Sequence, residues 1–285
     1  MTPSAKRQAV AILTSEHEVP VQRACSAVRL SRAAYYRPPG DRLGRDQPVI
    51  DALQAVVADR PRCGFWKCFD RLRLLGHGWN HKRVHRVYCA LRLNLPRRTR
   101  KRLVRAVRHP LGAQRALNQT WALDFMTDTL YDGRRFRTLN IMDEGNREAL
   151  AILAGTSLPS VRVVTVLEEL VTLHGRPTAL RMDNGPELTS RTLITWCEAR
   201  GIALRHIQPG KPQQNAYIER FNRSYRDEVL DAYIFGSIAD VRDETDRWLT
   251  YYNTERPHDS LGRVPPLTYL PRSTAPSEST IRVST

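Results

Sequence analysis

The spacing of apolar residues after residue 119 is typical of alternating strands and helices. Segments 120–130, 136–143 and 148–156 (TWALDFMTDTL, FRTLNIMD and EALAILAGT) are strand-like runs joined by tight turns, which predicts a three-stranded β-meander. The segments that follow predict a helix over 158–175, a strand over 178–185, a helix over 190–201, a strand over 202–208, and helices over 215–234 and 238–253. The order βββαβαβα predicts a layered α/β domain.

The pattern before residue 96 predicts only helices. Apolar stripes over 5–13 and 20–30 precede Ser31, which has the residue type of a helix N-cap, and Pro38-Pro39-Gly40 ends the short helix that follows. This layout predicts a small helix-turn-helix unit. Residues 38–48 are rich in Pro, Gly and charge, and predict a linker.

A second helical group follows this linker. Segments 49–59, 65–76 and 81–93 have helical periodicity, and the last of them presents His81, Lys82, Arg83 and Arg86 on the face opposite its apolar residues. A helix pair followed by a basic helix predicts a second DNA-binding unit.

Net charge separates the two halves of the chain. The 285 residues carry 45 Lys and Arg against 29 Asp and Glu, a net charge of +16. Residues 1–120 hold 25 basic and 7 acidic residues (+18), so residues 121–285 hold 20 and 22 (−2). A basic half joined to a near-neutral half indicates a polyanion-binding region attached to a second function. A cationic surface that serves solubility is the alternative, but it would not require the charge to lie in one half.

Residues 97–108 contain seven Lys and Arg and no acid, which predicts a basic linker along a nucleic-acid backbone. The expected organisation is therefore a helix-turn-helix-like segment over 1–40, a second helical DNA-binding unit over 46–96, a basic linker over 97–115, an α/β core with its C-terminal helix over 116–271, and a polar, disordered tail over 272–285.

Several classes of protein are disfavoured. No run of about 18 apolar residues exists, so a transmembrane helix is not expected. The short AVAIL segment near the N-terminus does not suffice for a signal peptide, which favours a cytoplasmic protein. Five cysteines, an odd number, do not suggest a disulfide framework.

Three carboxylates lie where chemistry is expected. Asp124 is in the middle of the first predicted strand, Asp183 ends a later strand, and Glu219 is one turn into the helix over 215–234. An acid on an apolar strand is costly unless it is paired or binds metal. Three carboxylates suit a pair of Mg²⁺ or Mn²⁺ ions that share one acid, as in phosphoryl transfer. Taken singly, each acid is more simply a surface or turn residue, as Asp183 in DNG would be; the set of three favours the metal.

These residues resemble the DDE catalytic core of the retroviral-integrase superfamily, which has a ribonuclease-H-like fold. Within it, the chain resembles the second-frame (OrfB) transposases of the bacterial insertion-sequence-three family. The matching pieces are TWALDF, RMDNGPEL, QPGKPQQNAYIERFNRSYRDE and YNTERPHDSLGRVPPLTYL, with moderate matches in LSRAAYYRPP and GWNHKRVHRVY. A departure is CGFWK at 63–67, where the family more often has Tyr-Gly-Tyr-Arg-Arg.

The resemblance implies a DNA transposase. Asp124, Asp183 and Glu219 would bind two Mg²⁺ or Mn²⁺ ions, water would free a 3′-hydroxyl at the transposon end, and that hydroxyl would attack another phosphodiester. The implied partners are terminal inverted repeats, target DNA and further copies of the chain on DNA. In this family a separate upstream frame often supplies a helix-turn-helix and a zipper, as a partner or a frameshift fusion. The implied location is a bacterial cytoplasm, at the nucleoid when on DNA.

Other residues are predicted to contact DNA. Asn215, Glu219, Asn222 and Arg226 are spaced by 4, 3 and 4, so they would share one helix face, with Arg226 at a phosphate. An ordinary Glu–Arg ladder is the alternative. Asp143 and Glu187 are not expected to be ligands. The further predicted contacts are Lys211 in the PGKPQQ loop, the basic helix residues named above, and Arg97, Arg98, Arg100, Lys101 and Arg102 in the linker.

Two alternatives remain open at this point. One is a ribonuclease-H-like nuclease that cuts without strand transfer, and the other is a catalytically silent DNA-binding relic. A zinc site built from His77, His81 and His85 with nearby cysteines is disfavoured, because the order and spacing do not match known zinc modules. Cys63 and Cys68 are instead expected in the core, and His81 and His85 at phosphate.

Overall fold

A computed structural model describes residues 1–37, 42–96, 116–208 and 215–272. The chain forms two units, Met1–Asp51 and Ala52–Thr285, and the boundary between them falls inside helix α4 (Arg42–Asp59). The predicted division into five segments stays a prediction. None of the helices among the described residues has the length and apolar character needed to cross a membrane.

The first unit is helical, as predicted. It contains α1 (Pro3–Ser15), α2 (Val21–Ala27) and α3 (Arg32–Tyr36). Val10, Ala24 and Cys25 form its buried centre. The Ser31 hydroxyl accepts a hydrogen bond from the Ala34 amide at 3.1 Å, which confirms Ser31 as the N-cap of α3.

The linker predicted over 38–48 is wrong in its second part, because α4 already begins at Arg42 and passes through Pro48. Proline lacks an amide donor, so the helix loses one backbone hydrogen bond at Pro48. A side-chain hydrogen bond spans this turn, because Gln47 Nε2 donates to Asp51 Oδ1 at 2.7 Å. Residues 38–41 lie outside the described residues.

The second unit adds two further helices before the sheet, α5 (Phe65–Leu74) and α6 (His81–Ala90). Their facing sides are apolar: Cys68 and Leu72 on α5, and Val84 and Tyr88 on α6, are buried. Asn80 caps α6 by accepting from the Lys82 amide at 2.8 Å. The helices predicted over 65–76 and 81–93 are therefore present and packed against each other.

The α/β core contains the predicted order of elements. These are β1 (Thr120–Thr129), β2 (Arg135–Asp143), β3 (Ala149–Gly155), α7 (Ser160–His174), β4 (Ala179–Met182), α8 (Arg191–Arg200), β5 (Ala203–His206), α9 (Ala216–Tyr225), η2 (Arg226–Leu230), α10 (Ile238–Thr254), η3 (Asp259–Leu261) and α11 (Pro266–Tyr269). The sheet order is β3-β2-β1-β4-β5, with β1, β2 and β3 antiparallel and with β4 and β5 parallel to β1. This is the ribonuclease-H-like arrangement that the sequence predicted.

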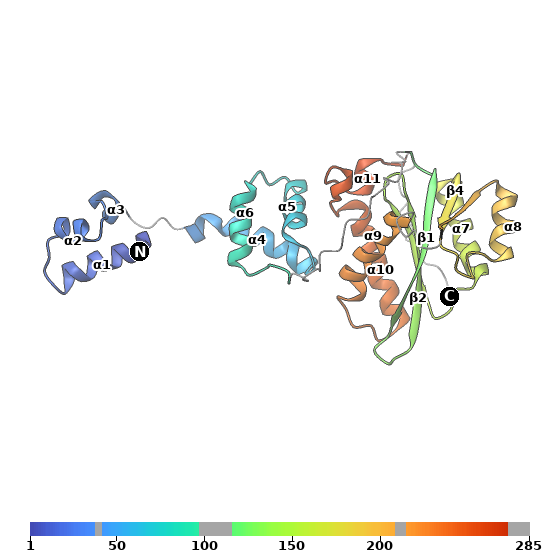
Figure 1. Ribbon diagram of the computed structural model, residues 1–285, viewed down its shortest axis with the longest axis horizontal. Coiled ribbons are helices and arrows are strands. Elements are labelled where there is room, and N and C mark those ends of the chain that lie inside the picture. Colours follow the sequence, from blue (N-terminus) through green and yellow to red (C-terminus); the bar gives the residue numbers. More distant parts are fainter. Residues whose placement is uncertain (38–41, 97–115, 209–214, 273–285) are drawn as a thin grey trace. The chain divides into compact units, whose positions relative to one another are not determined.

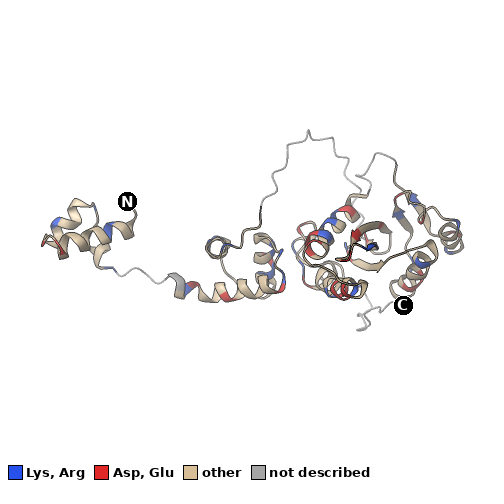
Figure 2. Ribbon diagram, turned by 90° about the horizontal axis from the view of Figure 1, so that it is seen from below, with Lys and Arg blue, Asp and Glu red and all other residues tan. Residues whose placement is uncertain are grey.

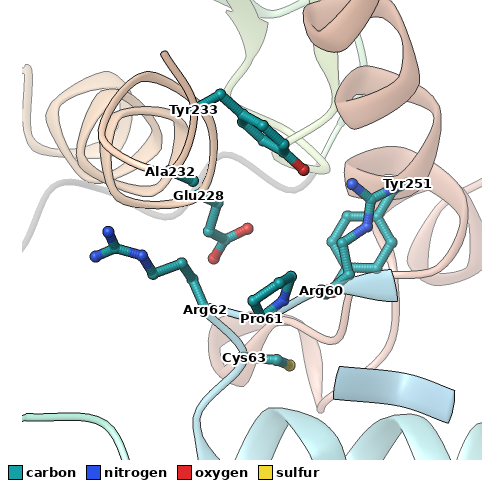
Figure 3. A pocket seen from close by; sticks show the side chains of 8 residues that line it. All are labelled: Arg60, Pro61, Arg62, Cys63, Glu228, Ala232, Tyr233 and Tyr251. Atoms are coloured by element: carbon teal, nitrogen blue, oxygen red, sulfur yellow. The ribbon is translucent and has the colours of Figure 1, made fainter. Parts of the chain in front are cut away.

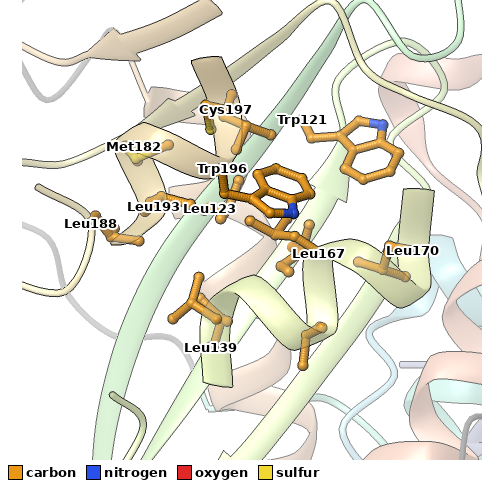
Figure 4. Close-up of a cluster of buried hydrophobic side chains, with 14 of the residues drawn as sticks. Trp121, Leu123, Leu139, Leu167, Leu170, Met182, Leu188, Leu193, Trp196 and Cys197 are labelled. Carbon is orange, nitrogen blue, oxygen red and sulfur yellow. The ribbon is translucent and has the colours of Figure 1, made fainter. Parts of the chain in front are cut away.

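Helices cover both faces of the sheet (Figure 1). Trp121 and Leu123 of β1 point into one buried cluster with α7 and α8 (Figure 4). Ala122 and Met126, on the alternate positions, point into a second cluster with α9 and α10. The period of two along β1 therefore assigns Asp124 to the face that α9 covers.

The helix predicted over 215–234 is not continuous. It is α-helical to Tyr225 and continues as a π-helical segment, η2, over Arg226–Leu230. A π-helical segment displaces the side chains that follow it from the 3.6-residue period. The sequence gives no periodic signal for such a change.

The predicted tail begins at residue 272, but Arg272 is held firmly. Its guanidinium donates to Asp143 Oδ2 at 2.9 Å and to Glu148 Oε2 at 2.6 Å, and only 9% of the side chain is exposed. Burying two carboxylates requires such a cation. Residues 273–285 lie outside the described residues.

Candidate active site

The sheet register brings two of the predicted carboxylates level with each other. In the parallel pairing of β1 with β4, Ala122 is opposite Arg181. Two residues further along each strand direction, Asp124 on β1 is level with Asp183, which directly follows β4. Alternation along the strands directs both residues toward the face that α9 covers.

Glu219 comes from above this face. It lies in the first turn of α9, which packs against β1 and β2. The positive end of the helix dipole favours a carboxylate in that turn. Helix and sheet thus present their acids toward each other.

The charge environment of Asp124 ties the three acids together. Burial raises the pKa of Asp124 to about 6, and the negative charges of Asp183 and Glu219 add to the rise. Hydrogen bonds from the Phe125 amide (2.9 Å to Oδ1) and from Asn222 oppose it. A buried acid repelled by two others is a group whose ionised form needs a cation.

An amide relay holds Asp124 from the other side. Asn222 Nδ2 on α9 donates to Asp124 Oδ2 at 2.7 Å. Asn140 Nδ2 on β2 donates in turn to Asn222 Oδ1 at 2.7 Å, and Asn140 is the cross-strand partner of Asp124. Asn222 was predicted to contact DNA. In the structure its Nδ2 donates to Asp124 and its Oδ1 accepts from Asn140, so both polar atoms of its side chain have partners within the protein. Asn140 was not predicted, because its position opposite Asp124 depends on the β1–β2 register.

The turn after β4 presents Asp183 through its own hydrogen bonds. Asp183 Oδ1 accepts from the Gly185 amide at 3.0 Å, and a Cβ on Gly185 would meet this oxygen at 3.0 Å. Asn184 Nδ2 donates to the Ile207 carbonyl at 3.1 Å. Glu187 is ion-paired with Arg137, and Asp143 is buried against Arg272. Both of these acids therefore have an arginine partner within the protein.

Two further predicted residues flank the site with different surroundings. Asn215 precedes α9, is 3% exposed, and its Oδ1 has no hydrogen-bond partner among the described residues. Arg226 pairs with Asp128 at 3.0 Å and donates to the Thr127 carbonyl at 2.9 Å, so it joins η2 to β1. The partner of Arg226 is thus an aspartate on β1 and not the glutamate of a Glu–Arg ladder, and its contact with a phosphate stays a prediction. Lys211 lies outside the described residues.

The donor set fits a divalent ion, although no group of three or more His, Cys, Asp or Glu side chains within the described ranges is arranged closely enough to hold one as it stands. Carboxylate oxygens are the ligands that Mg²⁺ and Mn²⁺ prefer.

The predicted DNA-binding face of α6 lies on the exposed side of that helix. His81, Lys82 and Arg86 are exposed, whereas Arg83 is half-buried. His81 stacks on Trp66 with ring centroids 6.1 Å apart. The predicted linker contacts, from Arg97 to Arg102, lie outside the described residues. In Figure 2 the helices of the α/β core carry both basic and acidic segments.

The residues considered for zinc have other partners. His77 stacks on Trp79 at 4.2 Å, and His85 meets the edge of Phe65 at 4.7 Å. Cys63 and Cys68 are 6% and 0% exposed, which confirms their assignment to the core.

A buried charge cluster, which sequence reasoning missed, lies on the far side of α9. Glu228 accepts hydrogen bonds from Arg256 (2.8 Å) and Lys67 (2.7 Å), and also from the Trp248 ring nitrogen (3.1 Å). Burial alone would raise the pKa of Glu228, but Arg256 and Lys67 outweigh it and hold this pKa at about 2. A small pocket beside it is lined by Arg60, Arg62, Cys63, Tyr233 and Tyr251, among others (Figure 3).

Comparison with known proteins gives consistent matches. Residues 114–212 and 200–266 each match the integrase core domain family. The chain is 36% identical to an uncharacterized 39.2 kDa protein of insertion element IS476 from Xanthomonas euvesicatoria, over 93% of this chain and 77% of that protein. It is 34% identical to an uncharacterized 31.7 kDa protein of insertion element IS407 from Burkholderia multivorans, over 90% and 93%. It is 24% identical to the putative transposase InsK of element IS150 from Escherichia coli, over 75% and 81%.

A five-stranded ribonuclease-H-like sheet within an integrase core domain defines a polynucleotidyl transferase of the DDE class. The matches extend beyond the core to nearly the whole chain. The chain belongs to the insertion-element transposases of the insertion-sequence-three family, OrfB type.

Proposed function

We propose that this transposase binds the terminal inverted repeats of its own element, cleaves there to free a 3′-hydroxyl, and joins that hydroxyl to target DNA with Asp124, Asp183 and Glu219 as its metal ligands. The observation that carries the proposal is the charge environment of Asp124, whose pKa is raised by burial and by the two other acids. A divalent metal ion belongs to the chemistry of this family, and we infer that two ions are bound.

The ions, when bound, would supply activation of the attacking oxygen and stabilisation of the leaving oxygen. The protein's own residues do the positioning. Asn222 and Asn140 fix the orientation of the Asp124 carboxylate, and the Gly185 amide fixes that of Asp183. Glu219 lies in the first turn of α9, close to the N-terminal end of that helix. With no nucleophilic side chain required, water and then the DNA hydroxyl can attack directly.

We further propose that the basic first part of the chain holds the DNA. The exposed residues of α6, together with the linker over 97–115, would neutralise phosphates. Binding of this kind releases counterions, so affinity should fall steeply as salt rises. A salt-insensitive affinity of the full-length protein would contradict this part of the proposal. Association with the nucleoid would follow from the same electrostatics.

The test uses full-length protein, labelled duplexes carrying the element's ends, and Mg²⁺. Wild-type protein should cleave the end and join it to a second duplex. Asp124→Asn, Asp183→Asn and Glu219→Gln should each abolish both steps while DNA binding persists. Glu168→Gln is the matched control, because this acid pairs with Arg200 on the opposite face of the sheet. Cleavage without joining by the wild type would instead indicate a nuclease, and binding alone a relic.

A further inference from the structure

Three arginines lie near one buried carboxylate, that of Glu144, beside the sheet face that α9 covers. Glu144 follows β2 and is 1% exposed. Arg181 Nη1 on β4 donates to Glu144 Oε1 at 2.8 Å, and Arg147 donates to the Glu144 carbonyl oxygen. Burial raises the pKa of Glu144, while the charges of Arg181, Arg147 and Arg205 lower it, so all three guanidinium groups lie near it.

The cluster holds more positive charge than its carboxylate needs. One arginine suffices to pair Glu144, and Arg272 serves the two neighbouring acids, Asp143 at 2.9 Å and Glu148 at 2.6 Å. Four arginines therefore face three carboxylates, a surplus of one positive charge. Arg147 Nε is buried and has no hydrogen-bond partner among the described residues. Arg205 on β5 is exposed. The acids are thus buried and matched, whereas the surplus cationic charge faces outward.

The strand register places two of these positive charges next to each other. Arg181 and Arg205 are directly opposite each other in the β4–β5 pairing. Like charges at directly opposed positions destabilise a sheet. Glu144 contacts Arg181 and relieves part of this repulsion, but an exposed arginine remains beside it. A second anion would relieve the rest.

The cluster also lies next to the proposed catalytic acids. Arg181 precedes Asp183 by two residues, so both point to the same face, about 6.6 Å apart along the strand at 3.3 Å per residue. The Arg147 guanidinium stacks on Tyr217 of α9 at 3.3 Å, and Tyr217 is two residues before Glu219. The arginines therefore connect to both elements that carry acids.

We propose that Arg205 and Arg181, supported by Arg147, form a binding site for one DNA backbone phosphate next to the scissile phosphate. The planar guanidinium fork matches a phosphate's oxygens and binds them with two hydrogen bonds. The inference rests on the proposed function, since it is DNA at the catalytic acids that brings this phosphate within reach. Either the transposon end or the target duplex can supply it.

The test replaces single phosphates by neutral methylphosphonates, one position at a time, in the end duplex and separately in the target duplex. With wild-type protein, one position beside the scissile phosphate should weaken binding about tenfold, the scale of one charge-assisted contact. With Arg205→Ala, binding should already be weaker, and that same position should lose its effect. Non-additivity at one position identifies the contact, and the duplex in which it occurs identifies the source of the phosphate.

Two further variants make the result specific. Arg205→Lys keeps the charge without the fork and should show a partial effect. Arg247→Ala is the control, because Arg247 is an exposed, ion-paired arginine on α10, which packs over β3 at the other edge of the sheet. Additive effects of Arg205→Ala at every position of both duplexes would overturn the proposal. If wild-type protein binds but neither cleaves nor joins, the proposed function fails, while the binding scan still decides the phosphate site.

Discussion

Asp124 has surroundings that favour its protonated form as long as no cation is near. Its pKa is raised to about 6, first by burial and then by Asp183 and Glu219. A folded-state pKa above the unfolded value of an aspartate means that ionising the group destabilises the metal-free protein. This destabilisation is absent below the unfolded value of 3.8, grows as pH rises from there to about 6, and is complete above about 6.

We therefore expect Asp124→Asn to stabilise the metal-free protein at neutral pH by about 1–3 kcal/mol, since one pKa unit corresponds to about 1.4 kcal/mol. Thermal or urea unfolding with chelator present measures this change. The gain should shrink as pH falls below about 6, where wild-type Asp124 is itself neutral. A destabilised variant at neutral pH would show that Asp124 is not held among other acids.

A substitution at Asn222 can distinguish a role in positioning Asp124 from a contact with DNA. Its amide bridges Asp124 and Asn140, so Asn222→Ala should leave a misoriented carboxylate. We expect a roughly 10–100-fold loss in divalent-metal affinity, the usual effect of removing a group that orients a ligand. Calorimetric titration with Mn²⁺ measures the metal, and anisotropy with labelled duplex measures DNA. An unchanged metal affinity combined with weaker DNA binding would return Asn222 to the predicted DNA contact.

At the scale of single residues, the sequence singles out three acids as candidate ligands but does not reveal the residues that hold them. Asp124 stands out because it interrupts an apolar strand, Asp183 because it ends one, and Glu219 because it lies one turn into the helix that follows. Asn140 lies in a strand of the same kind and gives no signal, because its function depends on the residue across the ladder. Arg205 could not be singled out from the sequence for the same reason, since only the β4–β5 register brings it opposite Arg181.

At the scale of elements, η2 is held by the charge cluster around Glu228. Arg256 lies just beyond α10 and Lys67 on α5, so one carboxylate joins three parts of the second unit. Removing one partner of a buried ion pair leaves an uncompensated charge, which typically costs about 3–5 kcal/mol. This cluster should therefore stabilise the unit more than any exposed pair.

We expect Arg256→Ala to lower the free energy of unfolding by about 3–5 kcal/mol, whereas Arg247→Ala, at an exposed pair, should change it by less than about 0.5 kcal/mol. The pH dependence has a defined sign. Because the pKa of Glu228 is lowered to about 2, its stabilisation is complete above the unfolded value near 4.5 and is lost as pH falls toward 2. Urea unfolding across this range measures both. Equal effects of the two alanine variants would contradict a special role for the cluster.

Elements were predictable wherever side chains follow one period. The meander of β1, β2 and β3 was found from alternation and turns, and α7 from an apolar stripe ended by Gly175. The helix after Asn215 was predicted too long as an α-helix because the π-helical segment keeps hydrophobic residues such as Val229 and Leu230 buried with a different spacing. The start of α4 was missed because proline is usually read as a boundary.

At the scale of the whole molecule, the order of strands and helices along the chain was predictable, and with it the fold class. The distribution of charge predicts that the first half of the chain binds DNA, and this stays a prediction. Strand transfer sets a further requirement, because two transposon ends must be brought together with a target. One set of the proposed catalytic acids can act at only one scissile phosphate at a time. The surplus of positive charge also opposes association of free copies through self-repulsion, and DNA would remove this barrier.

We therefore expect the free protein to be monomeric or weakly associated, and duplexes carrying the element's ends to drive it into a dimer or a higher assembly. Light scattering of the protein alone, of the complex with end duplex, and of the complex with an unrelated duplex of equal length measures the masses directly. Asp124→Asn should assemble like the wild type, since it removes chemistry and not phosphate contacts. A complex of one protein with one end that still performs strand joining would refute this expectation, because it would mean that a single site can process both ends in turn.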